Sequence, residues 1–93
     1  MRTKLCGLVG IKYPIFQGGM AWVSTSPLVV AVSEAGALGI LATGNMPKEL
    51  VEAELIKIHS MTKKPFGVNI MLARPVDELD EIINIVLEYP PAV

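Results

Sequence analysis

The sequence has little cysteine, little charge imbalance and no long uninterrupted hydrophobic run. Cys6 is the only cysteine, which excludes a disulfide framework and fits a reducing compartment. Eight basic and nine acidic residues leave a net charge of −1, so no basic face points to nucleic acid or to an anionic membrane. Prolines, glycines and polar residues interrupt the longest uncharged stretch, Tyr13–Ser33, unlike a spanning helix. The N-terminus also lacks the cleavage pattern of a secretory signal. We therefore predict a cytoplasmic protein that has neither a nucleic-acid partner nor a membrane partner.

Motifs for metal binding and nucleophilic catalysis are also missing. The sequence has no cysteine or histidine cluster with metal-ligand spacing, no Walker-type phosphate loop and no nucleophile elbow. Glycines in residues 36–39 precede a predicted strand, whereas a dinucleotide-binding loop follows one. His59 falls late in a predicted helix, where solvation is the simpler interpretation, and Cys6 lies in an apolar patch that favours packing. We therefore predict no metal ligand and no catalytic residue in this chain.

Hydrophobic residues are abundant for so short a chain. They make up 52% of the 93 residues, a content that excludes a disordered protein. A mass of 10.0 kDa allows one small domain at most. So much apolar surface in so small a domain indicates that the chain is part of something larger.

Three strand-like segments alternate with three helix-like segments. Each strand is a short apolar run, and each following helix begins near a proline, with capping or acidic residues beside it. The strand starts at 14, 38 and 66 are 24 and 28 residues apart, which places a fourth strand at about residues 92–93. The predicted order is strand 14–17, helix 28–35 after the N-cap Ser26, strand 38–42, helix 47–63, strand 66–72 and a helix from Arg74 onward.

Hydrophobic residues recur at helical spacing in the last two predicted helices. In helix 47–63, Val51, Leu55 and Ile58 follow one another at i, i+4 and i+7 and predict a buried stripe. The predicted solvent side of that helix carries Glu52, Glu54, Lys57 and Lys63. In the helix after Arg74, the predicted buried stripe is Leu79, Ile82, Ile83 and Val86.

Alternating strands and helices are typical of parallel βαβ units, and strands without polar alternation are typical of a sheet covered on both faces. We predict an α/β fold made of the first three βα units of a (β/α)8 barrel, truncated as strand 4 begins. A complete barrel needs about 250 residues, so residues 1–93 would form the N-terminal part of a single TIM-barrel domain. Because an open sheet leaves edges unpaired, the isolated chain is expected to be marginally stable or sticky.

Two positions fall where a barrel places its active site, at the C-terminal ends of strands. The first is the run Gln17–Trp22, in which the adjacent Gly18 and Gly19 let the backbone approach a flat ligand and the Met20 sulfur suits an aromatic ring. An ordinary tight turn with Trp22 in the core explains the same residues equally well. The second is Asn69, a lone polar side chain in strand 66–72, whose buried amide needs a backbone or ligand partner.

Three segments of the chain together resemble the first third of the nitronate monooxygenase family, whose members are also known as 2-nitropropane dioxygenases. The family includes flavin-dependent enoyl-acyl-carrier-protein reductases, whose first and third motifs this chain resembles especially closely. The resemblance implies an FMN-binding TIM barrel in which Gly18, Gly19 and Met20 lie against the isoalloxazine ring and Asn69 hydrogen-bonds the flavin. The matching segments are Tyr13–Trp22, Ser33–Ile40 and Lys64–Leu72.

The resemblance also implies a class of reaction. A nitronate monooxygenase oxidises an alkyl nitronate with O₂ to a carbonyl compound and nitrite, whereas the reductases use NAD(P)H to reduce FMN and then an enoyl thioester. The full-length protein is accordingly expected to act on a small molecule, and to form a homo-oligomer. A third interpretation is a non-catalytic remnant βα module that associates with a partner through its uncovered apolar faces.

The 93-residue chain by itself is expected to bind no FMN tightly. The family's catalytic histidine and its glycine-rich loops for the FMN phosphate lie downstream of these residues, and His59 does not match that histidine. Barrel phosphate sites are built from the loops after late strands, so this part of the pocket would be missing. The absorption spectrum of the purified chain should lack flavin bands. A yellow chain with stoichiometric flavin would contradict this prediction.

Overall fold

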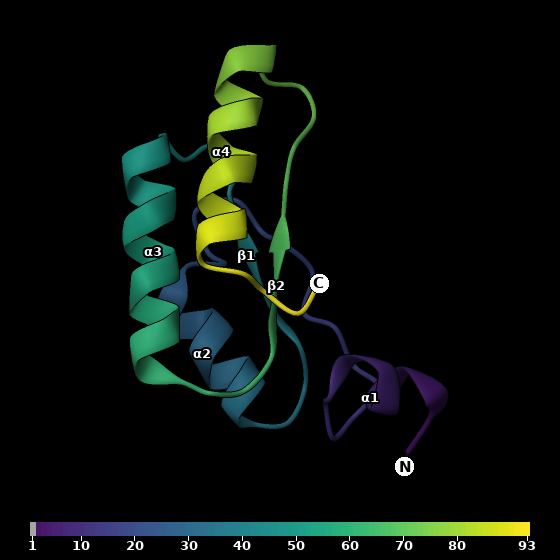
Figure 1. Ribbon diagram of the computed structural model, residues 1–93. Helices are drawn as coiled ribbons and strands as arrows, with labels where there is room; N and C mark the ends of the chain where they lie inside the picture. Colours follow the sequence, from purple (N-terminus) through teal and green to yellow (C-terminus); the bar gives the residue numbers. More distant parts are fainter. Residues whose placement is uncertain (1) are drawn as a thin grey trace.

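Parallel pairing of two short strands organises the computed structural model, which describes residues 2–93. Strand β1 (Gly39–Ala42) pairs in parallel with β2 (Phe66–Asn69), so both strands end at the same edge of the sheet. The helices are α1 (Lys4–Val9), α2 (Ser26–Glu34), α3 (Lys48–Met61) and α4 (Val76–Glu88). Figure 1 shows α3 and α4 side by side, with α1 apart from them near the N-terminus. Within residues 2–93, no helix has the length and apolar character needed to cross a membrane.

The α/β class predicted from the sequence is confirmed, but the observed strands are fewer and shorter than predicted. Segment 14–17 does not form a strand in the described chain and contributes only an isolated parallel bridge between Phe16 and Leu38. Strand 66–72 ends at Asn69. Apolar composition identified the right segments, but strand length depends on how far a neighbouring backbone stays within hydrogen-bonding distance.

Residues Ala92 and Val93 lie against β2, where the fourth strand is predicted. The Ala92 N–H donates to the Phe66 carbonyl at 2.8 Å, and the Val68 N–H donates to the Val93 carbonyl at 2.9 Å. The structure assigns no strand to these two residues. Their hydrogen bonds nevertheless show that β2 is engaged along both of its edges, by β1 and by the segment after α4.

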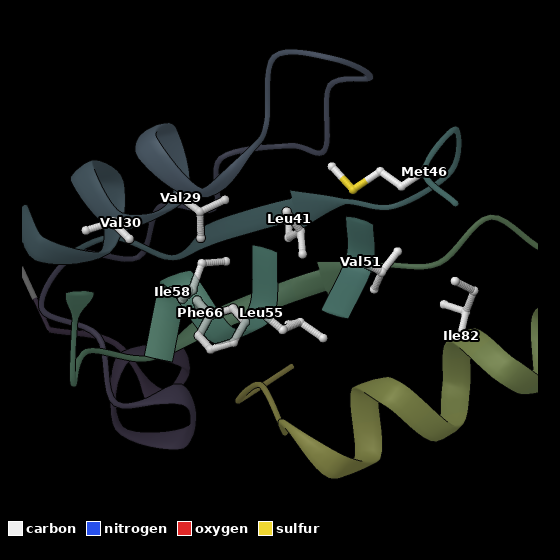
Figure 2. Close-up of a cluster of buried hydrophobic side chains, with 9 residues drawn as sticks. All are labelled: Val29, Val30, Leu41, Met46, Val51, Leu55, Ile58, Phe66 and Ile82. Carbon is white, nitrogen blue, oxygen red and sulfur yellow. The ribbon is translucent and has the colours of Figure 1, made fainter. Parts of the chain in front are cut away.

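The main hydrophobic core lies between the sheet and helices α2, α3 and α4 (Figure 2). The stripe predicted for α3 is confirmed, because Val51, Leu55 and Ile58 are all fully buried. Burying a side chain of this size contributes about 1.5–3 kcal/mol relative to leaving it exposed, so α3 is held mainly by this face. The buried members of the core are Val29, Val30, Leu41, Met46, Val51, Leu55, Ile58, Phe66 and Ile82.

The stripe predicted for α4 is correct only in part. Ile82 is almost fully buried and Val86 packs against the core, but Ile83 is exposed. Ile85 and Tyr89 also pack against the core, so the buried face of α4 is rotated from the predicted one. The hydrophobic pattern alone does not predict which face of α4 is buried, because α4 has more apolar residues than one contact face can cover.

Cys6 packs as predicted. Its side chain is fully buried in a second, smaller cluster with Ile11 and Leu38, against which Val9 and Ile40 also pack. Thr3 is the N-cap of α1, and its side-chain oxygen accepts a hydrogen bond from the Cys6 N–H at 3.4 Å. The cluster therefore joins the N-terminal helix to the start of β1.

Glu54 lies in the core instead of on the predicted solvent side of α3. Its side chain accepts hydrogen bonds from the Ser26 hydroxyl at 2.8 Å and from the Ser26 N–H at 3.3 Å. Ser26, predicted as an N-cap, is instead the first residue of α2, and Thr25 at the cap position makes no side-chain capping bond. The Glu54 carboxylate thus satisfies the helix N-terminus from a neighbouring helix, where a negative charge also suits the helix dipole.

Helix α2 crosses β1 so closely that Gly39 has no room for a side chain. A methyl group at Gly39 would lie 2.3 Å from the Val29 carbonyl oxygen and 2.9 Å from the Val29 Cα. The Gly39 N–H donates to the Ser33 hydroxyl at 3.1 Å, which ties the same strand residue to the end of α2. Both close approaches of the methyl group are to backbone atoms, so the neighbour cannot move aside cheaply.

Substituting Gly39 is expected to weaken the fold. Gly39→Ala should lower the free energy of unfolding by about 2 kcal/mol or more, because the added methyl must displace the α2 backbone. Urea denaturation of the purified protein, followed by circular dichroism, measures the change. Gly7→Ala is the matched control, since its methyl would meet the Arg2 side chain at an ordinary 3.5 Å within a helix. Equal midpoints for the two variants would contradict the close-packing argument.

Candidate functional site

Three segments of the chain leave the sheet region at the same edge. Residues 17–24 follow the isolated bridge, residues 43–46 follow β1, and residues 70–75 follow β2. In parallel α/β folds, ligand sites form at the C-terminal ends of the strands. Thr43 joins two of these segments, because its N–H and its hydroxyl both donate to the Asn69 carbonyl, at 3.3 and 2.8 Å. This edge is therefore the candidate site.

Gly19 and Asn69, two of the predicted site residues, lie directly against one another. A methyl group at Gly19 would lie 3.1 Å from the Asn69 Cβ, 3.3 Å from its Cγ and 3.5 Å from its Oδ1. The two shorter distances are tighter than most side-chain contacts, so the missing side chain lets the loop close onto the end of β2. The structure thus brings together two residues that are 50 positions apart in the sequence.

The residues on either side of Gly19 are open to a ligand. A methyl group at Gly18 would meet no atom within 4 Å. The Met20 side chain is 45% exposed, although it belongs to a hydrophobic residue. The run Gly18–Met20 therefore presents bare backbone and a polarizable sulfur side by side.

The burial predicted for the Asn69 side chain is wrong. Asn69 is the last residue of β2 and is exposed at the edge of the sheet. Its carbonyl is bonded to Thr43, while its side chain lies beside Gly19. The amide offers a donor and an acceptor at an accessible position.

Gln17 and Ser24 hold the glycine loop in place. Gln17 begins the predicted run but had no predicted role, and Ser24 was not predicted as a site residue. Ser24 is fully buried, and its hydroxyl oxygen accepts a hydrogen bond from the Met20 N–H at 2.8 Å. The Gln17 amide nitrogen donates to the same hydroxyl at 2.7 Å, and its Oε1 accepts from the Ile40 N–H at 3.0 Å. The sequence indicates this role only weakly, through polar residues close to a double glycine. It does not show the hydrogen-bond partner of Gln17, because Ile40 on β1 is 23 residues away.

Trp22 lies outside the core, which removes the interpretation of this loop as an ordinary turn with a buried tryptophan. Its side chain is 72% exposed, and its φ of 65° is in the left-handed region. A bulky residue in that region is strained, and such strain is concentrated at functional sites. The tip of the loop therefore carries an exposed aromatic ring on a constrained backbone.

Two cavities lie at opposite edges of the sheet. One of about 610 Å³ lies near the candidate site, where the Arg74 guanidinium donates to the carbonyls of Gly44 and Met46 and joins the loops after β1 and β2. A cavity of about 740 Å³ is lined by Gly36 and Lys64, just before β1 and β2 begin. Although it is larger, barrel folds do not use this N-terminal edge for catalysis.

His59 lies outside the candidate site, whereas Lys48 and Glu81 line the cavity of about 610 Å³ near it. His59 is exposed near the end of α3, with its ring edge-on to Phe66 at 5.3 Å. Lys48 and Glu81 pair at 3.2 Å between α3 and α4, and this hydrogen bond raises the pKa of Lys48. Among residues 2–93, no group of three or more His, Cys, Asp or Glu side chains could hold a metal ion.

The sequence matches the family model for nitronate monooxygenase over residues 2–88. It is 47% identical over 70 residues to (3aS,4S,5R,7aS)-5-hydroxy-7a-methyl-1-oxo-octahydro-1H-indene-4-carboxyl-CoA dehydrogenase of Mycobacterium tuberculosis, covering 75% of this chain and 20% of that protein. It is 38% identical over 79 residues to a probable nitronate monooxygenase of Staphylococcus saprophyticus, covering 85% of this chain and 22% of that one. The chain thus spans about a fifth of the length of these relatives.

The fold of this chain is also similar to parts of solved structures. FabK from Thermotoga maritima superposes with a TM-score of 0.87 at 41% identity, over 95% of this chain and 28% of that chain. Nitroalkane oxidase from Streptomyces ansochromogenes superposes with a TM-score of 0.81 at 26% identity, over 91% of this chain and 34% of that one.

The contact between Gly19 and Asn69 can be tested without a ligand. Gly19→Ala should shift the Asn69 side-chain amide resonances in ¹⁵N NMR spectra, because the methyl displaces that side chain, at a cost in stability of about 1 kcal/mol. Gly18→Ala is the control, since its methyl points into open space. Asn69 resonances that move equally in both variants, or in neither, would contradict the observed packing.

Proposed function

Because this chain belongs to the nitronate monooxygenase family, we propose that it supplies flavin-contacting residues of an FMN-dependent oxidoreductase. The observation that carries the proposal is the contact between Gly19 and Asn69 at the C-terminal edge of the strands. Two predicted flavin residues from distant parts of the sequence meet at the edge where α/β folds bind their ligands. The proposed binding residues are Gly18, Gly19, Met20 and Asn69.

The residues at this edge fit a flat, hydrogen-bonding ring such as the isoalloxazine of FMN. Gly18 has open space where a side chain would stand, so the loop backbone can lie against the ring face. Met20 is half-exposed beside it and can contact an aromatic surface through sulfur. The exposed Asn69 amide has both a donor and an acceptor for the polar edge of the ring.

Bound FMN would supply the redox chemistry, and these residues would bind and orient it. The glycine loop would set how closely the backbone approaches the ring, and Asn69 would fix the rotation of the ring in its plane. The exposed side chains of Trp22 and Leu72, 72% and 77% accessible, stand on two loops of the same edge and could exclude water. The proposed reaction is oxidation of an alkyl nitronate with O₂ to a carbonyl compound and nitrite.

A second candidate is the reduction of an enoyl thioester with NAD(P)H. The likeness to FabK, an enoyl-acyl-carrier-protein reductase, favours it, as does the relative named for a carboxyl-CoA compound. Both candidates place the same residues against FMN, and they differ in the substrate side of the pocket. In either case we propose that residues 1–93 form the first units of a TIM barrel within a homo-oligomeric protein that acts on a small molecule.

Two assays on the protein expressed from its complete reading frame separate these candidates. Oxygen uptake and nitrite release that depend on an alkyl nitronate, without nicotinamide, are expected for the first. Oxidation of NAD(P)H that requires an enoyl thioester would favour the second. Asn69→Ala should weaken FMN binding by about tenfold, as expected when a hydrogen bond to a bound ligand is lost.

The proposed function would be contradicted if that protein contained no flavin and showed neither of the two activities. Asn84→Ala is the control for Asn69→Ala, because Asn84 is an exposed amide on α4, outside the candidate site. Equal FMN affinity of both variants would remove Asn69 from the binding residues while leaving the reaction open to the two assays.

A further inference from the structure

We propose that Gln17 is a positioning residue whose side-chain amide takes the place of strand backbone and thereby shapes the Gly18–Met20 loop for its ligand. The identity of that ligand as FMN rests on the proposed function. The geometry of the loop does not, because it follows from hydrogen bonds within residues 17–40. Gln17 is half-buried at the point where the chain leaves the sheet.

Backbone pairing of segment 14–17 is confined to Leu38, just before β1, and stops at Gln17. Up to this residue the ladder is backbone: the Leu38 N–H donates to the Ile15 carbonyl and the Gln17 N–H donates to the Leu38 carbonyl, both at 2.9 Å. Two residues further on, Ile40 of β1 bonds to the Gln17 side chain instead. Its N–H donates to Gln17 Oε1 at 3.0 Å, and its carbonyl accepts from Nε2 at 3.4 Å.

Because the Gln17 side chain bonds to Ile40 in place of backbone, the backbone of the loop does not have to stay paired with β1. A side-chain amide has the same donor and acceptor as a peptide group, so it can satisfy Ile40 while the main chain turns away. The chain then turns so that Gly19 lies against Asn69 instead of continuing beside β1. Without the amide, the Ile40 N–H would lose its partner, and the start of the loop would lose its attachment to Ile40.

Ser24 extends the same network to the far side of the loop. Its hydroxyl accepts from Gln17 Nε2 at 2.7 Å and from the Met20 N–H at 2.8 Å, and the Gln17 amide also donates to the Gly18 carbonyl. The Ala42 N–H donates to the Ser24 carbonyl at 3.1 Å, which anchors the end of the loop to β1. Gln17 and Ser24 therefore hold the loop at both of its ends.

The hydrogen-bond partners allow only one orientation of the Gln17 amide. Oε1 faces a donor, Ile40 N–H, whereas Nε2 faces the carbonyl oxygens of Gly18 and Ile40. Gln17→Glu keeps the shape but places a second acceptor against those oxygens, which is repulsive. Protonation of the substituted carboxyl would restore a donor at this position.

Hydrogen exchange in the apoprotein tests the positioning role without flavin. In the protein expressed from its complete reading frame, Gln17→Glu at neutral pH should speed exchange of the Ile40 and Met20 N–H groups by about tenfold or more. Repulsion from the Gly18 and Ile40 carbonyls would displace the introduced carboxylate and loosen the loop. Exchange at Leu55 and Ile58 in the core should stay unchanged. Asn84→Asp, which makes the same chemical change on the exposed face of α4, should leave all four rates unchanged.

Flavin titration tests the consequence for the ligand. Gln17→Glu should raise the FMN dissociation constant about tenfold at pH 7 and alter the absorption spectrum of the bound flavin. The loss should shrink toward about pH 5, where the substituted carboxyl begins to take up a proton. Asn84→Asp should bind FMN as the unsubstituted protein does at both pH values.

The outcomes separate the two proposals. Unchanged exchange at Ile40 and Met20 in Gln17→Glu would overturn the positioning role, and so would faster exchange with unchanged FMN affinity. A pH-independent loss accompanied by faster exchange at Leu55 and Ile58 would also overturn it, because it would mark general destabilisation. If the unsubstituted protein binds no FMN, the proposed function fails, and the exchange comparison alone decides whether Gln17 positions the loop.

Discussion

Strand β2 and the segment before Gln17 both run parallel to the chain at Leu38–Ala42, and this alignment positions the loops that follow. It makes β1, β2 and the segment before Gln17 end at one edge, so three loops from distant parts of the sequence emerge together. The close crossing of α2 over Gly39 fixes β1 from behind, and the stripe of α3 joins the same core. At the opposite edge the same strands begin, and the cavity there lies beside the segments that enter the sheet. Geometry of the sheet thus decides where a ligand site can form.

Polar side chains complete backbone hydrogen bonding at three places where regular structure stops. Gln17 substitutes for strand backbone opposite Ile40, Ser33 accepts from the first residue of β1, and Glu54 satisfies the N-terminus of α2. An unsatisfied buried backbone group costs about 1–3 kcal/mol, so these side chains determine where strands and helices can end. Short elements can therefore persist in a small sheet, and the loops between them acquire defined shapes.

Membership of the nitronate monooxygenase family gives this geometry its functional meaning. The glycine loop and the end of β2 would form one side of a flavin pocket in which bare backbone, sulfur and an amide face the ligand. FabK and nitroalkane oxidase both superpose on this chain, so proteins named for different reactions share this arrangement of strands and helices. Differences among such relatives are then expected in the parts of the pocket that contact substrate, since the residues proposed here would face the cofactor.

Local composition and a 3.6-residue period were enough to predict the α/β class, the order of elements from α2 to α4 and the buried stripe of α3. They did not predict α1, and segment 14–17 forms a bridge instead of the predicted strand. The sequence also located the glycine run and Asn69, since a double glycine and a lone amide stand out in apolar surroundings. The burial of Glu54, the exposure of Asn69 and the role of Gln17 follow instead from contacts between distant segments. The partners of Glu54 and Gln17 lie 28 and 23 residues away, and the exposure of Asn69 depends on where β2 stops. The periodicity of hydrophobic residues shows which face of a helix or strand is apolar. It does not show which distant residues pack or hydrogen-bond against that element.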